Sequence, residues 1–391
     1  MNEQGENKVF ILFLIIFRVL RSVAAGIIAI SFPYLILTKL RYSAFTLGSI
    51  YTVAIIATAV LGLMIGYIAD AGSRKKSLLL ASLILPISAL MVYYSNNIFI
   101  LFIAAAIGGY SATGSLAGGG VGGLAAPAQD ALMIDLAPPR RRTFYFSLAI
   151  FLAGFGAALG ALLIDHMSEQ NLFLLAASIS FISVLFIIPI SDNKNDKKRK
   201  YLFGPIKNKA IIGKFTTAGI LNGFSQGLIT PFLIPFFIII YHISIQQMSV
   251  YAFISGLIGS FALLLAPWLD RHFGFLKSIV FTRGIGTIAT VALPIFRVLP
   301  ISLGIYFLIP ALRIAATPIQ QSALTEMIDG EEMGRVLGIN QSVGLAASST
   351  ATVFSGYLFS LDEIGIPFYL YGILMAANLL LYYKFFKNFK H

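Results

Sequence analysis

Long uninterrupted runs of apolar residues, separated by short polar loops, dominate the pattern along this chain. A helix needs about 20 apolar residues to cross a hydrocarbon core of roughly 30 Å, and these runs reach that length. Membrane β-barrels instead show short strands of alternating polarity, and no such alternation occurs here. The pattern predicts twelve transmembrane helices, at residues 9–37, 43–68, 77–95, 98–130, 143–165, 171–190, 210–240, 246–268, 276–294, 299–327, 334–358 and 364–386.

The composition supports this class and excludes several kinds of site. Hydrophobic residues make up 58% of the chain and charged residues 11%, whereas a soluble domain carries about 25% charged residues. The chain has no cysteine, which excludes disulfides and thiolate chemistry. Its four histidines do not have metal-ligand spacing. We therefore expect no metal and no cofactor, and the absence of a clustered set of catalytic residue types predicts that the protein is not an enzyme.

The basic residues concentrate in alternate loops. If both termini are cytoplasmic, most of the 28 Lys and Arg residues face the cytoplasm, and the external loops hold Lys39, Arg41 and Arg297. This is the positive-inside bias of membrane proteins. It predicts a multi-pass protein of the cell membrane with both termini cytoplasmic. The net charge of +12 is then explained by anionic lipid headgroups, and we expect no nucleic-acid partner.

One long polar segment divides the chain into two halves. The segment SDNKNDKKRKYLFGPIKNK, residues 191–209, lies between the sixth and seventh predicted spans. Its charge is typical of a solvated linker. We therefore predict an N-terminal six-helix bundle at 1–190, a cytoplasmic linker at 191–209 and a C-terminal six-helix bundle at 210–391.

The two halves repeat the same motifs. GYIADAGSRKK follows the second span and APWLDRHFGFLK follows the eighth, which aligns Asp70 with Asp270. APAQDALMIDLAPPRRR ends the fourth span and TPIQQSALTEMIDGEEMGR ends the tenth, which aligns Asp135 with Glu326. Duplicated six-helix halves are a recurring plan of secondary transporters.

The first of these motifs resembles the signature of the major facilitator superfamily, and the likeness extends over essentially the whole chain. That signature reads Gly, three residues, Asp, Arg, any residue, Gly, Arg, Lys. Gly66, Asp70 and Arg74 match it, whereas Ala71 and Ser73 replace its first Arg and its second Gly. The resemblance implies an all-α membrane protein with two pseudo-symmetric six-helix bundles, which move around a central site by alternating access.

The resemblance also implies a latch at the cytoplasmic ends of the helices. Asp70 would hold the two halves together at the start of the eleventh span, and Arg74 would pair with Asp130 or Asp135. The alternative is that these charges only determine topology. The predicted gate and latch residues are Gly66, Asp70, Arg74, Asp130, Asp135, Asp270, Arg271, Glu326 and Arg335.

A glycine-rich stretch, GSLAGGGVGGLAAPAQD, occupies residues 114–130. A phosphate-binding loop would need a preceding strand and a Lys-Ser/Thr ending, and neither is present. Each glycine costs a helix about 1 kcal/mol, and non-helical backbone at membrane depth is tolerated where it lines a cavity or is buried. Two interpretations stay open, an unwound segment near the transport path or a close helix-packing seam. The glycines in question are Gly118, Gly119, Gly120, Gly122 and Gly123.

Polar residues within the spans indicate where a solute would bind. Arg18 and Arg21 lie three apart in the first span, Arg313 lies halfway along the tenth, and the seventh contributes Asn222 and Gln226. Intramembrane charges are costly and usually functional. The resemblance implies that spans one, four, seven and ten surround the central cavity. The alternative for Arg18 and Arg21 is a structural pairing with a carboxylate or with backbone carbonyls.

The cavity expected from these spans carries arginine, and the acidic residues nearest to it lie at span ends. Arginine binds carboxylates and phosphate esters bidentately. We therefore predict a secondary active transporter of an organic anion. The alternative is a multidrug or lipophilic-compound efflux transporter of the same superfamily, although Ala157 replaces the proline of the antiporter signature in the fifth span. Expected partners are the small solute, membrane lipids and a coupled proton or counter-ion, and we expect a monomer.

One further arginine, Arg283, lies near the cytoplasmic start of the ninth span. Long basic side chains near helix ends commonly reach toward the membrane surface while their stems stay in apolar surroundings. We therefore expect Arg283 to snorkel rather than to bind solute.

Overall fold

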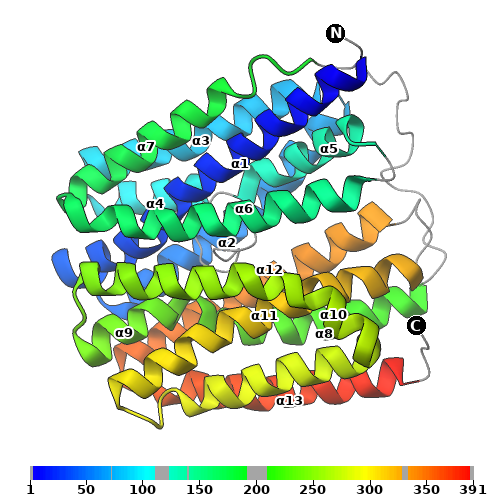
Figure 1. Cartoon of the computed structure of the whole chain (residues 1–391). Helices are drawn as coiled ribbons and strands as arrows, with labels where there is room; N and C mark the ends of the chain where they lie inside the picture. Colours follow the sequence, from blue (N-terminus) through cyan, green and yellow to red (C-terminus); the bar gives the residue numbers. More distant parts are fainter. Residues whose placement is uncertain are drawn as a thin grey trace. The chain divides into compact units, whose positions relative to one another are not determined.

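A computed structural model of the chain describes residues 3–71, 73–110, 123–138, 141–191, 209–327 and 333–387 (Figure 1). Within these ranges the secondary structure is helical and contains no strand. The elements are α1 (Glu3–Tyr34), η1 (Leu35–Lys39), α2 (Ala44–Ala71), α3 (Arg74–Tyr94), α4 (Ile98–Gly108), η3 (Gly123–Ala125), α5 (Ala126–Leu136), α6 (Arg142–Leu162), η5 (Leu163–His166), α7 (Glu169–Leu185), α8 (Lys209–Ile229), η6 (Thr230–Phe232), α9 (Leu233–Tyr241), α10 (Ile245–Ala292), α11 (Leu299–Met327), α12 (Met333–Ser360) and α13 (Gly365–Phe386).

These helices confirm the predicted all-α membrane fold. Eight helices in the described part of the chain are long and apolar enough to cross a membrane. α10 covers two predicted spans in 48 residues, and its backbone reverses at Gly274, whose φ of 72° and ψ of 169° are not helical. Glycine adopts such a positive φ without steric penalty. The predicted eighth and ninth spans are therefore the two arms of one helical hairpin.

The fourth predicted span consists of two helices, α4 and α5, among the described residues. α4 ends at Gly108, and Gly109 follows in the left-handed conformation with a φ of 64°. The Tyr110 backbone N–H then bonds the Ala105 carbonyl at 3.1 Å, as in an ordinary left-handed helix cap. Gly118, Gly119, Gly120 and Gly122 lie outside the described residues, and Gly123 begins η3.

The chain forms two compact units. Unit 1 comprises Met1–Tyr42, Val53–Lys200 and Ile243–Gly256, and unit 2 comprises Ser43–Thr52, Tyr201–His242 and Leu257–His391. Each unit thus contains one short segment from the other sequence half. The predicted 1–190 and 210–391 bundles stay a prediction, and residues 192–208 of the predicted linker lie outside the described ranges.

Glycine contacts explain why those two short segments join the other half. In unit 2 the start of α2 packs on α12, where a Cβ at Gly48 would lie 3.0 Å from the Gly356 Cα. In unit 1 the start of α10 packs on α6, where a Cβ at Gly256 would lie 2.9 Å from the Ala158 Cβ. Small residues allow helix backbones in membranes to approach this closely.

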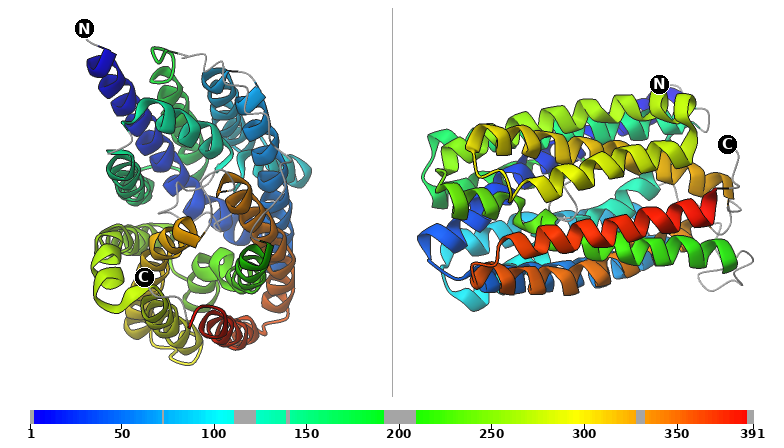
Figure 2. Two further views of the ribbon diagram at one scale, coloured as in Figure 1. Left: turned by 90° about the vertical axis from the view of Figure 1, so that its right-hand side faces the viewer. Right: turned by 90° about the horizontal axis from the view of Figure 1, so that it is seen from below.

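The core of each unit is built on one long helix pair. In unit 1, α1 packs along α6, and a Cβ at Gly26 or Gly160 would clash with carbonyls of the opposite helix. In unit 2, α8 packs along α12 with the same dependence on Gly223 and Gly227. Figure 2 shows these helices running side by side. The closely packed helices α1 and α8 carry the polar side chains of the candidate site, Arg18 and Arg21 on α1 and Asn222 and Gln226 on α8.

Candidate functional site

The arginines of α1 have partners within unit 1. The Arg18 Nη1 forms an ion pair with the Asp130 Oδ1 on α5 at 3.1 Å, with exposed side-chain fractions of 9% and 43%. Arg21 Nη1 donates to the Ser82 carbonyl of α3 at 3.3 Å. The two side chains therefore contact different neighbouring helices. These contacts match the alternative considered for both residues, a structural pairing with a carboxylate or with a backbone carbonyl.

Helix α5 buries an apolar face, with Leu132 and Met133, in the core of unit 1, and polar side chains add specific contacts to its neighbours. Gln129 Nε2 donates to the Leu14 carbonyl of α1 at 3.3 Å, next to the Arg18–Asp130 pair. Further along α5, Asp135 forms a second ion pair. Its Oδ2 lies 2.5 Å from the Nη1 of Arg74, at the start of α3. Of the two carboxylates considered as partners for Arg74, the structure therefore selects Asp135, because Asp130 is paired with Arg18.

The other predicted latch residues are described less fully. The structure does not describe the surroundings of Gly66 or the side chains of Asp70, Glu326 and Arg335. Asp270 is half-buried and Arg271 is exposed, in the hairpin of α10. The latch therefore stays a prediction that rests on the resemblance and on the Arg74–Asp135 contact.

In unit 2, Arg313 lies within a set of neutral polar groups. Its Nη1 donates to the Thr230 Oγ1 at 2.5 Å and to the Gln226 Oε1 at 3.1 Å. Thr230 Oγ1 in turn donates to the Gln226 Oε1 at 2.9 Å. The sequence therefore correctly associated Arg313 with Gln226. Both acceptor oxygens are neutral, so these two hydrogen bonds orient the guanidinium and do not themselves supply a counter-ion.

Two buried tyrosines near Arg313, Tyr306 on α11 and Tyr371 on α13, extend this set. We call it the Arg313 cluster and define it as Arg313, Gln226, Thr230, Tyr306 and Tyr371. The predicted residue Asn222 lies one helical turn before Gln226 on α8 and is half-buried. Four elements, α8, η6, α11 and α13, therefore supply polar groups near one arginine.

The prediction that Arg283 snorkels is wrong. Its side chain is buried, and its guanidinium donates to the Asn378 Oδ1 at 3.1 Å and to the Gln320 Oε1 at 2.5 Å. Its Cζ lies 4.9 Å from the centroid of the Tyr382 ring, which is cation–π distance. Asn378 also donates to the Ala218 carbonyl at 2.7 Å. Arg283 thus joins α10, α11 and α13. The sequence feature that could have indicated a buried partner for Arg283 is Asn378, an amide within an apolar run.

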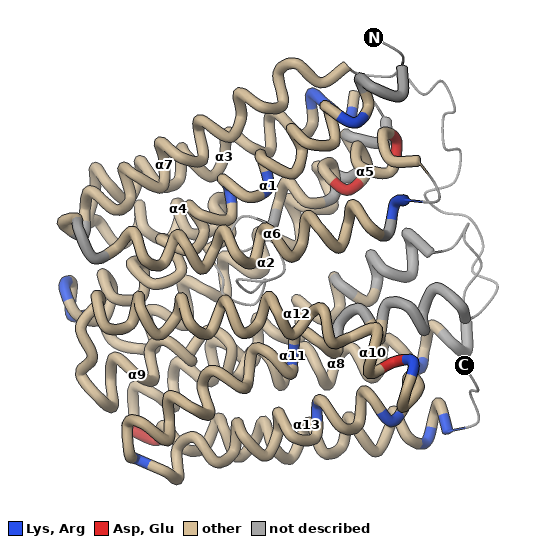
Figure 3. The backbone as a smooth tube through the Cα atoms, viewed as in Figure 1, with Lys and Arg blue, Asp and Glu red and all other residues tan. Residues whose placement is uncertain are grey.

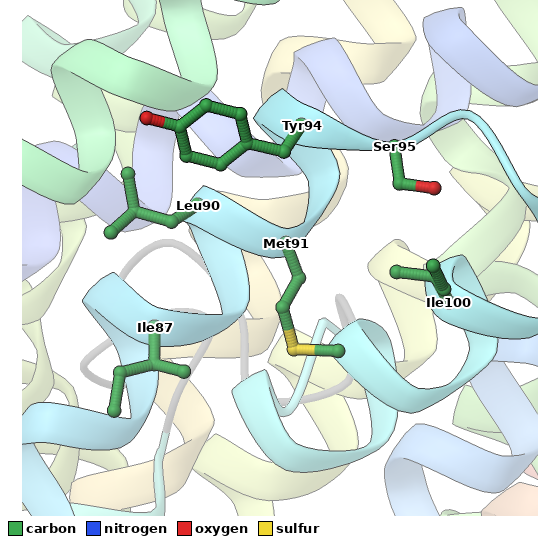
Figure 4. Close-up of a pocket in the computed structure, with 6 residues that line it drawn as sticks. All are labelled: Ile87, Leu90, Met91, Tyr94, Ser95 and Ile100. Atoms are coloured by element: carbon green, nitrogen blue, oxygen red, sulfur yellow. The ribbon is translucent and has the colours of Figure 1, made fainter.

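A separate hollow of about 390 Å³ lies between α3 and α4 (Figure 4). Its lining residues are Ile87, Leu90, Met91, Tyr94, Ser95 and Ile100. The predicted site residues are not among them, and Tyr94 is largely exposed at its rim. This apolar hollow has no charged group that would select an anion. Among the described residues, no group of three His, Cys, Asp or Glu could hold a metal ion.

Comparisons with known proteins agree on one family. The sequence model of the Major Facilitator Superfamily matches residues 14–352. The multidrug resistance protein MdtG of Proteus mirabilis (strain HI4320) is 24% identical over 85% of this chain and 84% of its own length. An inward-facing, occupied crystal structure of a bacterial homologue of the human lysosomal transporter Spinster has a TM-score of 0.76, with 14% identity over 97% of this chain and 96% of that one. A D-xylose–proton symporter gives 0.71, with 18% identity and 97% coverage of both chains. At these identities the solved structures show a shared fold.

Proposed function

The chain belongs to the major facilitator superfamily, and we propose that it carries a small organic anion across the membrane by binding it at Arg313. Members of this family are multi-pass membrane transporters rather than enzymes. The proposed solute is a carboxylate or a phosphate ester. The proposed setting is the cell membrane, with both termini cytoplasmic and the protein acting as a monomer coupled to a proton or a counter-ion.

The observation that carries this proposal is the position of the Arg313 guanidinium halfway along α11, where the side chains of Gln226 and Thr230 orient it. Gln226 and Thr230 hold one side of the guanidinium through neutral oxygens. Arginine stays charged and binds carboxylate or phosphate oxygens in a two-pronged geometry. An anion that reaches this group gains a charge-assisted bond in surroundings of low dielectric constant, where such bonds are stronger than in water.

The other intramembrane arginines are weaker candidates for direct binding. Arg18 already has the Asp130 carboxylate as its counter-ion at 3.1 Å. Arg21 and Arg283 are buried and occupied with structural acceptors, the Ser82 carbonyl for Arg21 and the Asn378 amide for Arg283. In an alternating-access cycle we assign Arg18 and Arg21 to holding α1, α3 and α5 together. The Arg74–Asp135 contact then belongs to the proposed latch.

The test is thermal unfolding of the purified protein with a panel of carboxylates, phosphate esters and lipophilic cations. A ligand at about 100 times its Kd stabilises the folded state by about 2.7 kcal/mol, so one anion class should raise the Tm. Arg313→Gln should abolish that rise. Arg297→Gln, an exposed arginine in the loop after α10, removes the same charge and should retain it.

Two results would contradict the proposal. One is an anion-induced rise in Tm that persists in Arg313→Gln and disappears in Arg18→Gln, which would move the binding site to unit 1. The other is stabilisation by lipophilic cations alone, unchanged in Arg313→Gln.

That second result would favour the alternative function, efflux of lipophilic compounds. The observation behind it is the name of two relatives of this chain. The multidrug resistance proteins MdtG of Proteus mirabilis and of a Rahnella strain are 24% and 27% identical to it. Efflux assays with lipophilic dyes distinguish the two functions. Cells that express an Arg313-dependent anion carrier should not export the dyes, whereas cells that express a multidrug efflux transporter should.

A further inference from the structure

The hairpin of α10 carries an exposed aromatic and basic surface that solute transport does not use. The two arms, residues 245–273 and 275–292, meet at the left-handed Gly274. At this turn the ring of Phe275 packs 5.6 Å from Phe386, so the hairpin lies beside the end of α13 in unit 2. We define the hairpin patch as Trp268, Arg271, His272, Phe273, Lys277 and Phe281.

The rings of the hairpin patch form a continuous array across both arms. Trp268 and His272 have ring centroids 4.7 Å apart, and Trp268 meets Phe273 edge-on at 5.9 Å. Phe273 stacks on Phe281 at 6.3 Å with an interplanar angle of 16°. Trp268, Phe273 and Phe281 are nevertheless 52%, 47% and 53% exposed. Aromatic side chains exposed in this way are typical of the membrane–water interface.

The position of the patch along the two arms fits that interface. Before the turn, Leu264 and Leu265 are exposed on the outer face and lead to Trp268. After the turn, exposed Phe281 and Ile288 continue the apolar surface away from Lys277. The hydrocarbon-facing surface of both arms therefore ends at the same level, where the aromatic and basic side chains begin.

The exposed charges of the hairpin are positive. Arg271 and Lys277 are exposed, and the acid of the hairpin, Asp270, is half-buried. Figure 3 shows Lys and Arg gathered at this end of unit 2, close to the end of α13, while the helix interiors are largely uncharged. Basic side chains at the edge of an apolar surface attract anionic headgroups of the adjacent leaflet.

We propose that the hairpin patch is a binding site for an anionic phospholipid. Arg271 and Lys277 bind the headgroup phosphate, and Trp268 lies at the level of the glycerol backbone. The acyl chains follow the exposed leucines before the turn and the exposed Phe281–Ile288 face after it. This inference goes beyond the proposed function and does not depend on which solute the protein carries.

The chain offers a native reporter for this site, because Trp268 is the only tryptophan in the sequence. The full-length protein is placed in phosphatidylcholine nanodiscs that contain a fixed fraction of either brominated phosphatidylglycerol or brominated phosphatidylcholine. Bromine quenches tryptophan fluorescence at short range. Each nearby basic side chain favours an anionic lipid by about fivefold, so brominated phosphatidylglycerol should quench Trp268 severalfold more effectively.

A matched pair of variants assigns the effect. Arg271→Gln with Lys277→Gln should make the two brominated lipids equally effective. Arg41→Gln with Arg297→Gln removes the same charge from exposed residues of other loops and should preserve the preference. Equal quenching in the wild-type protein, a preference that survives in the first double variant, or one that is lost in the second would overturn the proposal.

Discussion

The fourth and tenth spans are repeat counterparts, yet they are built differently. α11 runs without interruption over 29 residues from Leu299 to Met327. The fourth span is described as two helices of 11 residues each, α4 and α5. A helix of 11 residues is about 16 Å long, too short to cross a hydrocarbon core of roughly 30 Å by itself. The two counterparts thus consist of one uninterrupted helix and one pair of short helices whose ends must be satisfied by contacts with neighbouring helices.

The anchors differ in kind at the two short helices. The end of α4 is held by a glycine cap and by Tyr110, whose hydroxyl bonds the Ser88 Oγ at 3.1 Å and whose ring meets Phe32 at 5.1 Å. α5 buries an apolar face in the core and has two ion pairs in addition, Asp130 with Arg18 and Asp135 with Arg74. α11, by contrast, carries Arg313 halfway along its length, and the Arg313 guanidinium donates to the neutral oxygens of Gln226 and Thr230. The two repeat counterparts therefore use their polar residues in different contacts.

Breaking the Arg18–Asp130 pair should have the largest effect on this comparison. Asp130→Asn leaves the Arg18 guanidinium nearly buried without its counter-ion. Removing one partner of a fully buried pair costs about 3–5 kcal/mol, and the 43% exposure of Asp130 reduces this to about 2 kcal/mol. We expect a clear fall in Tm, measured by thermal unfolding in detergent.

The double variant Arg18→Gln with Asp130→Asn is the control, because it removes both charges. It should regain part of the lost stability. A double variant less stable than either single one would show that the ion pair does not anchor α5.

The cap of α4 predicts an intermediate effect. Gly109→Ala places a Cβ on a residue with a φ of 64°, which costs roughly 1–2 kcal/mol for a non-glycine residue. The same change in α11, Gly304→Ala, meets open space and should stabilise the helix by up to about 1 kcal/mol. Thermal unfolding of the two variants should therefore shift in opposite directions, and equal shifts would mean that α4 is not capped at Gly109.

The smallest effect is expected at the Tyr110 hydroxyl. Tyr110→Phe keeps the ring against Phe32 and removes the bond with Ser88, which should destabilise the protein by about 1 kcal/mol. Amide hydrogen exchange locates the loss, because protection should fall at the end of α4 and remain unchanged in α11. A uniform loss of protection over both helices would contradict a local anchor.

Much of the architecture follows from the sequence pattern. The predicted span 299–327 coincides with α11, and the runs at 246–268 and 276–294 match the two arms of α10. Apolar length alone decides such elements, because a hydrocarbon core accepts only segments that satisfy their own backbone. The association of Arg313 with Gln226 was also predictable, from polar positions on two spans expected to line one cavity.

The partners of the charged side chains were harder to predict from the sequence. Asp130 and Asp135 were equivalent candidates for Arg74 from the sequence, and only the packing of α5 against α1 and α3 assigned Asp130 to Arg18. Arg283 looked like a snorkelling residue because its distance from the span end was known and its neighbours were not. The amides of Asn378 and Gln320, from distant parts of the chain, explain its burial.

The sequence by itself therefore determined the membrane class, the number and order of the spans, the repeat and the family. Those properties depend on local apolar length and on motifs, which are properties of contiguous residues. Only the tertiary structure decided which carboxylate pairs with which arginine, where segments such as Ser43–Thr52 pack, and that Gln226 and Thr230 accept hydrogen bonds from Arg313. Those outcomes depend on distances of a few ångströms between helices far apart in the chain, and electrostatic interactions at low dielectric constant change steeply over such distances.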